Sequence, residues 1–197
     1  MEKKFVITIA RGFGSGGKMI ASMVARELGI ECHEHDILTM AAAKSGYDRK
    51  KFAEADEKLV KSSLLSALSE SFVPNDVLFK HQSNVIRELA DKESCVIVGK
   101  CADYVLRDRE NVFSFYIEAK REFCLKNVMN KMDITELEAN ELISATDKYR
   151  ADYYKHYADG NYWTNPVNYD LTLNSGKLGV ENCVRVICDY VKLRMGE

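Results

Sequence analysis

The segment from residues 12 to 18 constrains the fold most, because it places four glycines and a lysine between two patterned segments. Residues 5–9 (FVITI) are mostly β-branched or apolar, as in a buried strand, and residues 20–28 carry apolar side chains at helical spacing. The glycines and Lys18 fit the pattern G-x-x-x-x-G-K. Its backbone N–H groups surround phosphate oxygens, the next helix points its positive end at them, and the lysine neutralises the β- and γ-phosphates. A plain strand-to-helix turn is the alternative, but the lysine at this offset favours a phosphate site.

The position after the loop lysine lacks the hydroxyl of the full pattern. There a Ser or Thr would ligate Mg²⁺, whereas Met19 and Ile20 follow Lys18 here. Ser15 carries the nearest other hydroxyl. We therefore expect Ser15 or water to complete the metal shell, or the metal to be bound more weakly.

Composition excludes several classes of protein. The 197 residues carry a formal net charge of −2, so no positive surface argues for nucleic-acid binding. No apolar run is long enough for a membrane helix, and the residues before the first strand are too few for a signal peptide. The cysteines form no C-x-x-C pair and are expected to be reduced thiols of a cytoplasmic protein.

The remaining patterns alternate between strand and helix. Further strands are expected at 30–36, 94–99, 112–117 and 169–174, and further helices at 37–92, 102–106, 118–132, 134–157 and 181–193. Residues 1–197 are therefore expected to form one α/β domain, a P-loop NTPase-type three-layer sandwich. Its five-stranded parallel sheet would have helices on both faces and a helical lid.

The helical region 37–92 is much longer than one crossover helix. Apolar residues between Leu59 and Leu68 suggest one helix, and Pro74-Asn75-Asp76 suggests a break before another. This region is either a flap over the acceptor side of the sheet or a scaffold or dimer surface.

Asp36 closes the second expected strand, at the edge of the sheet where α/β folds bind ligands. It can also cap the following helix. His33 and His35, with Cys32 beside them, raise the possibility of a zinc site, but no further cluster of Cys or His completes four ligands.

Three further charged residues occupy positions that suit phosphate chemistry. Lys100 follows a glycine at the end of a strand, where a cation can reach a phosphate. Asp147 and Arg150 are spaced i,i+3 and share one helix face. They form either a surface ion pair of little energetic value or a lid pair whose arginine closes on a transferred phosphoryl group.

Separated segments together resemble the cytidylate kinase-like family, a P-loop branch of the nucleoside monophosphate kinases, over essentially the whole chain. The segments are ITIARGFGSGGK, HDIL, VIVGKCADYVLRD, DKYRADYYKHYADGNYW and NYDLTLNS. The resemblance implies ATP as phosphoryl donor, a nucleoside monophosphate such as CMP or dCMP as acceptor, Mg²⁺, and a lid over residues 131–163.

The chain differs from that family's pattern at several positions. Ile20 replaces a threonine, Lys100 replaces an arginine, and an arginine early in the helix after the fourth strand falls on Cys124. Of the arginine-rich lid, only Asp147 and Arg150 match. Because fewer arginines make fewer bidentate phosphate contacts, the acceptor is left open between a nucleoside monophosphate and another small molecule. A nucleotide-binding regulatory protein with weak catalysis is the third hypothesis.

We assign roles as follows. The nucleotide-binding residues are Gly12, Phe13, Gly14, Ser15, Gly16, Gly17, Lys18 and Met19. The catalytic residues are Lys18, Arg150 and Asp147, and the acceptor-binding residues are Arg11, Asp36 and Lys100. Asp36 is also assigned to Mg²⁺ through water. The expected partners are small-molecule nucleotides, with no nucleic acid and no membrane, and the oligomeric state is open.

Overall fold

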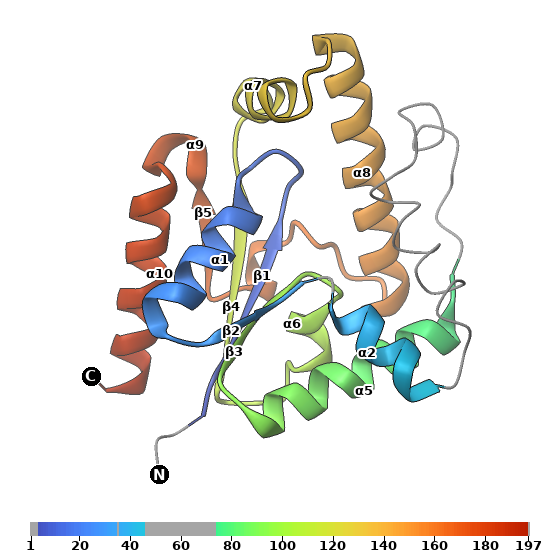
Figure 1. Ribbon diagram of the computed structural model, residues 1–197, viewed down its shortest axis with the longest axis vertical. Coiled ribbons are helices and arrows are strands. Elements are labelled where there is room, and N and C mark those ends of the chain that lie inside the picture. The colour runs from blue at the N-terminus through green and yellow to red at the C-terminus, as the bar shows by residue number, and fades with distance from the viewer. Residues whose placement is uncertain (1–3, 35, 46–73, 197) are drawn as a thin grey trace.

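A parallel sheet of five strands runs through the centre of the protein (Figure 1). The computed structural model describes residues 4–34, 36–45 and 74–196. The strands are β1 (Val6–Arg11), β2 (Glu31–His33), β3 (Cys95–Val98), β4 (Val112–Glu118) and β5 (Leu171–Asn174). Their order is β2-β3-β1-β4-β5, and every neighbouring pair is parallel. The predicted α/β fold with a five-stranded parallel sheet is confirmed.

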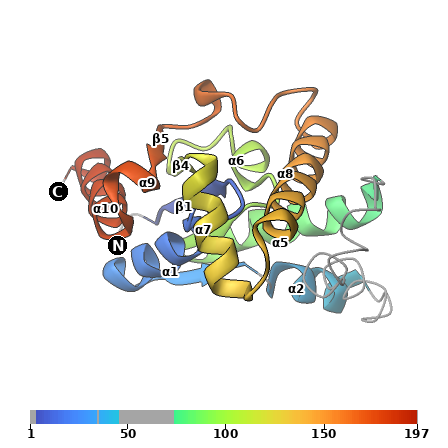
Figure 2. The ribbon, with the colours of Figure 1, turned by 90° about the horizontal axis from the view of Figure 1, so that it is seen from above.

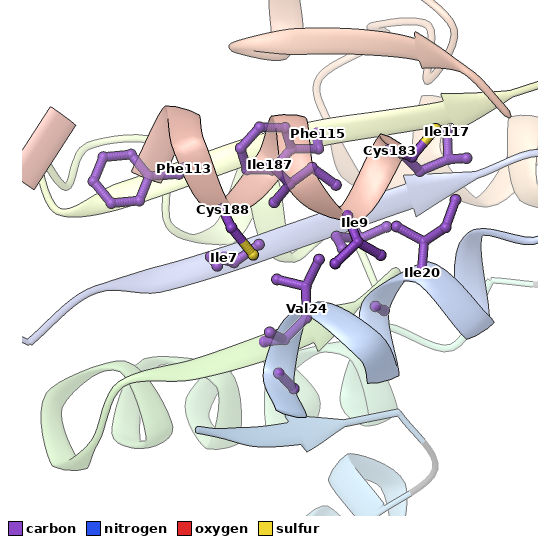
Figure 3. Packing of buried hydrophobic residues seen from close by; sticks show 14 of the residues in the cluster. Ile7, Ile9, Ile20, Val24, Phe113, Phe115, Ile117, Cys183, Ile187 and Cys188 are labelled. Atoms are coloured by element: carbon purple, nitrogen blue, oxygen red, sulfur yellow. The ribbon is translucent and has the colours of Figure 1, made fainter. Parts of the chain in front are cut away.

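Helices cover both faces of this sheet. They are α1 (Gly17–Leu28), α2 (Asp36–Ser45), α5 (Asp76–Lys92), α6 (Ala102–Val105), α7 (Arg121–Met132), α8 (Glu136–Tyr157), α9 (Ser175–Leu178) and α10 (Val180–Met195). On one face Ile7 and Ile9 of β1 pack against α1 and α10 (Figure 3). On the other, Val6 of the same strand packs with α2, α5 and α6. Alternate side chains of a strand point to opposite faces, so these apolar strands are buried on both sides.

Helices α7 and α8 lie at the end of the sheet where the strands finish. Seen from above, α7 crosses over β1 and α8 runs beside it on the side of α5 (Figure 2). Arg121 links the two helices, because its guanidinium donates to the carbonyl and side chain of Asn140 and to Ser144 Oγ. Helix α8 begins with the predicted capping box, in which Thr135 and Glu138 satisfy each other's free backbone N–H groups.

Several predicted boundaries were wrong, including the start of β5, which lies at Leu171 and not at residue 169. Strand β2 ends at His33 rather than at Asp36, and Asp36 is the first residue of α2. At this point the ring of His33 bonds both to Asp36 and to Glu93 at the end of α5, contacts that accompany the change from strand to helix. Glu118, expected to begin a helix, ends β4 instead, where it pairs with Asn174 of β5.

The predicted helical region 37–92 is described in part. Helices α2 and α5 occupy its two ends and pack against each other. The helix expected between Leu59 and Leu68 lies outside the described residues, as does His35. Among the helices that the structure describes, none has the length and apolar character needed to cross a membrane.

Candidate functional site

Backbone geometry shapes the glycine-rich loop between β1 and α1. Gly14 and Gly16 both have φ +82°, a left-handed conformation that costs residues with a Cβ about 1–2 kcal/mol. At Gly14 space is also lacking, since a Cβ there would lie 2.7 Å from the carbonyl oxygen of Cys124 on α7. Asn127 of α7 donates to the Gly14 carbonyl at 2.9 Å. The loop is therefore curled as a phosphate loop requires, with α7 against one side of it.

The structure indicates which group can replace the metal-binding hydroxyl that is missing after Lys18. Ser15 is fully buried and donates its hydroxyl to the Gly12 carbonyl at 2.8 Å. This hydroxyl is engaged in a hydrogen bond within the loop, and it does not point outward as a metal ligand would. Ile20 is fully buried in the sheet core, whereas Met19 is exposed. Of the two expected sources of the remaining ligand, water is the one that this geometry favours.

Lys18 has an acidic neighbour that sequence reasoning missed. Oε1 of Glu34 lies 2.7 Å from Lys18 Nζ and 4.0 Å from Arg11 Nη2. Glu34 is the residue directly after β2, so it stands at the carboxyl end of that strand. This is the position that we assigned to Asp36. The signal was therefore present in the sequence, but the misplaced end of β2 directed it to Asp36 and left Glu34 unnoticed.

Arg11 turns toward the end of β3. Its Nη1 occupies the space that a Cβ on Gly99 would fill, so the glycine at that position admits the guanidinium. Gly99, Lys100 and Cys101 have φ values of 71°, 58° and 53°, three left-handed residues in succession. Such backbone is uncommon outside glycine and gathers at ligand sites. Arg11 and Lys100, both predicted to bind the acceptor, thus flank the same glycine at the ends of adjacent strands.

Asp36 takes a different place. Its Oδ2 bonds to Nδ1 of His33, and Nε2 of the same ring lies 3.1 Å from Glu93 Oε1. Because both ring nitrogens face carboxylates, this cluster ties the end of β2 to α2 and α5. In the described parts of the chain no group of three or more His, Cys, Asp or Glu residues is arranged to hold a metal ion.

Asp147 and Arg150 come together against the phosphate loop. Asp147 Oδ1 accepts from the Phe13 backbone N–H at 2.8 Å and from Arg150 Nη1 at 3.3 Å. Arg150 Nη1 also donates to the Arg11 carbonyl at 3.0 Å, and its guanidinium stacks over the Phe13 ring. The two side chains are only 29% and 20% exposed, so the pair is no ordinary surface ion pair. Burial raises the pKa of Asp147 and lowers that of Arg150, and in each case the ionised partner opposes the shift.

The carboxyl-terminal half of α8 is bonded to α5 and α6, the helices on the face of the sheet that carries Val6. Tyr154 donates its hydroxyl to Asp103 of α6 at 2.6 Å, and Tyr153 donates to Gln82 of α5 at 3.0 Å. Burial raises the pKa of Asp103 to about 6. The tyrosines around Trp163, which also include Tyr116 and Tyr169, form a packed cluster. Helix α8 therefore joins the loop to the core.

Comparison with known proteins agrees with this architecture. The sequence pattern of the family described as "Cytidylate kinase-like family" matches residues 6–177. A cytidylate kinase from Archaeoglobus fulgidus is 24% identical over 192 residues, which cover 95% of each chain. An uncharacterized protein from Eubacterium ventriosum has a crystal structure with a TM-score of 0.75 and 27% identity, covering 96% of this chain and 99% of its own. Shikimate kinase from Acinetobacter baumannii has a TM-score of 0.54 and 13% identity over 96% of this chain and 94% of its own, which shows a shared P-loop kinase fold alone.

Proposed function

Because the chain belongs to the cytidylate kinase-like family, we propose that it transfers a phosphoryl group from ATP to a nucleoside monophosphate, with CMP or dCMP the preferred acceptor. One observation carries the proposal. The phosphate loop, Arg11 and the turn at Lys100 lie at the ends of adjacent strands, while Arg150 reaches this edge from α8. Phosphoryl transfer depends on positioning and on neutralising charge, and this edge supplies cations from several directions.

The donor half of the site is the loop. Backbone N–H groups of Gly14 and of residues 16–19 hold the ATP phosphates, aided by the amino end of α1. The N–H groups of Gly12, Phe13 and Ser15 already have acceptors within the protein and shape the loop. Lys18, whose side chain is 46% exposed, bridges the β- and γ-phosphates. In the structure this lysine pairs with Glu34, so we expect nucleotide binding to replace a carboxylate with phosphate oxygens.

The acceptor half is built from side chains. Arg11 and Lys100 receive the acceptor phosphate, and Asp36 holds a ribose hydroxyl or an ordered water. Arg150 stabilises charge on the transferred group, and Asp147 orients it through the bond between them. Because Asp147 also accepts a hydrogen bond from the Phe13 N–H, it fixes the position of the arginine relative to the loop.

The residues present fit a magnesium ion that arrives with the nucleotide. Mg²⁺ prefers hard oxygen ligands, keeps several waters and needs only one or two carboxylates besides substrate phosphates. Glu34 beside Lys18, with Asp36 two residues further on, supplies carboxylates of this kind. When bound, the ion would neutralise phosphate charge and orient the phosphates. Glu34 and Asp36 would hold it through its water shell.

A second acceptor class has a specific observation in its favour. Glu34 places a carboxylate beside the phosphate-binding cations, where it repels a phosphate acceptor but can accept a hydrogen bond from an alcohol. A kinase of a small hydroxyl compound is therefore the alternative.

A panel of acceptors tests these proposals. Purified protein with ATP and Mg²⁺ is offered CMP, dCMP, UMP, AMP and GMP, then shikimate, gluconate and other polyols, and ADP formation is measured. We expect the highest kcat/KM with CMP or dCMP. Highest activity on an alcohol would replace the proposal with the alternative. Tight ATP binding without transfer to any acceptor would indicate a nucleotide-binding regulatory protein.

A further inference from the structure

Glu34 brings a negative charge into the group of cations at the end of the sheet. Its Oε1 is within hydrogen-bond distance of Lys18 Nζ, at 2.7 Å, and its carboxylate is 22% exposed. Arg11 Nη2 stands 4.0 Å from the same oxygen. The contact is a close ion pair in a partly buried position, where opposite charges attract more strongly than at an open surface. The Glu34 carboxylate is therefore paired with the lysine that a phosphate loop uses to bind its ligand.

To bind Lys18, nucleotide phosphates must displace the Glu34 carboxylate from it. Glu34 directly follows β2, so its backbone stays at this edge of the sheet when phosphates bind. Once displaced, its carboxylate remains close to the incoming phosphates. Like charges at short distance repel strongly in a partly buried site, because water and salt screen them less than at an open surface.

A divalent cation on the phosphates changes this balance. Mg²⁺ reduces the negative charge of the nucleotide and gives the displaced carboxylate a new positive partner, either directly or through water. The cost of breaking the Lys18–Glu34 pair is then offset for metal-bound nucleotide and not for free polyanions.

We propose that Glu34 makes this site select metal-bound nucleotide over free phosphate anions, by competing for Lys18 until a metal ion compensates its charge. The inference rests on the proposed function in taking ATP as the donor. It assigns to Glu34 a role in discrimination at the loop that does not depend on the identity of the acceptor.

Calorimetry of ATP binding tests the proposal without any turnover. Wild type and Glu34→Gln are titrated with ATP in EDTA and then with ATP in excess Mg²⁺. Removing the charge should tighten binding of free ATP about tenfold, because Lys18 loses a competing ion-pair partner. Binding of the magnesium complex should stay within about threefold, so the preference for metal-bound nucleotide falls by roughly tenfold.

Two variants serve as controls. Glu34→Asp keeps the charge and should keep the weak binding of free ATP. Glu31→Gln removes an exposed charge from the start of the same strand and should leave both affinities within about twofold of wild type. Thermal unfolding of every variant verifies that the fold is retained.

Each remaining outcome would overturn the inference. Unchanged or weaker free-ATP binding in Glu34→Gln would make Glu34 a group that merely positions Lys18. If Glu34→Gln tightened ATP binding equally with and without Mg²⁺, Glu34 would compete with phosphates for Lys18 but would not select metal-bound nucleotide. If the wild type bound no ATP under either condition, the proposed donor would fail as well, which separates this result from a failure of the inference alone.

Discussion

The proposed donor half and the proposed acceptor half of the site are held in place by different parts of the polypeptide. In the donor half, glycines at φ +82° shape the loop, and buried hydroxyls support it from below, since Ser175 donates to the Ser15 carbonyl at 2.5 Å. In the acceptor half, the guanidinium of Arg11 from β1 lies against Gly99, in the turn that follows β3. Lys100 and Cys101 of that turn adopt left-handed conformations without being glycine.

This difference predicts how each half responds to substitution. A site made of backbone N–H groups depends on main-chain path, so an added Cβ harms it more than most side-chain changes. A site made of side chains depends on the identity of each residue, while its backbone already tolerates left-handed φ values at residues with a Cβ. Substitutions that separate ATP binding from acceptor use can therefore test the comparison.

The largest effect is expected from Lys18→Ala. It removes the side-chain contact that the donor half makes to the moving phosphoryl group, and losing such a contact costs on the order of 10²-fold or more in turnover. The melting temperature should change little, because the side chain lies in the loop and is 46% exposed. Steady-state kinetics beside thermal unfolding measure both. Near-normal turnover would rule out the assigned role.

Arg150→Ala should come next, with turnover lowered by roughly 10²-fold and ATP affinity within a few-fold of wild type. The reason is that an arginine acting on the transferred group contributes to the transition state more than to ground-state binding. Arg150→Lys should recover little, because an ammonium cannot reproduce the planar contacts to the Arg11 carbonyl and Asp147. Kinetics and calorimetry on the same preparations provide the comparison. Equal losses in affinity and turnover would instead place Arg150 in ground-state binding.

A matched pair of glycine variants sharpens the contrast between the halves. In Gly14→Ala the new Cβ meets the backbone carbonyl of Cys124 at 2.7 Å, which cannot easily yield, so ATP affinity should fall about tenfold or more. In Gly99→Ala its three nearest atoms all belong to the movable guanidinium of Arg11. ATP affinity should then hold within about threefold, while KM for the acceptor rises. Identical affinity losses in both variants would contradict the division into two halves.

The smallest effect is expected at Asp103, which ties α6 behind the acceptor turn to α8. Burial raises its pKa from 3.8 to about 6, so the folded protein binds this proton more tightly than the unfolded chain does. The contribution of this carboxyl to stability should therefore be greatest below about pH 4, decline between pH 4 and 6, and be level above. Asp103→Asn removes this slope, and from pH 4 to pH 7 it should gain roughly 1–3 kcal/mol relative to wild type. Urea unfolding at both pH values checks this, with Asp108→Asn as an exposed control. A difference that does not change with pH would refute it.

Much of the fold and the donor half could be read from local sequence. The strand 5–9, the loop glycines and Lys18 follow one another, so a short window holds the entire pattern, and both faces of the sheet are buried by continuous apolar runs. The capping box at Thr135 and Glu138 is equally local. In these cases the interacting groups are a few residues apart and chain geometry alone brings them together.

The acceptor half needed tertiary structure. Glu34 meets Lys18 because β2 and β1 end at the same edge with β3 between them, and no spacing in the sequence encodes that approach. The end of β2 was itself misplaced, and it lies where His33 contacts Glu93, sixty residues away. Likewise the i,i+3 spacing showed that Asp147 and Arg150 share a helix face. That this face contacts Phe13 and Arg11 was decided by the packing of α8 across the loop. Local patterns determine which residues are neighbours along an element, and only the burial of whole elements against one another determines which charges meet.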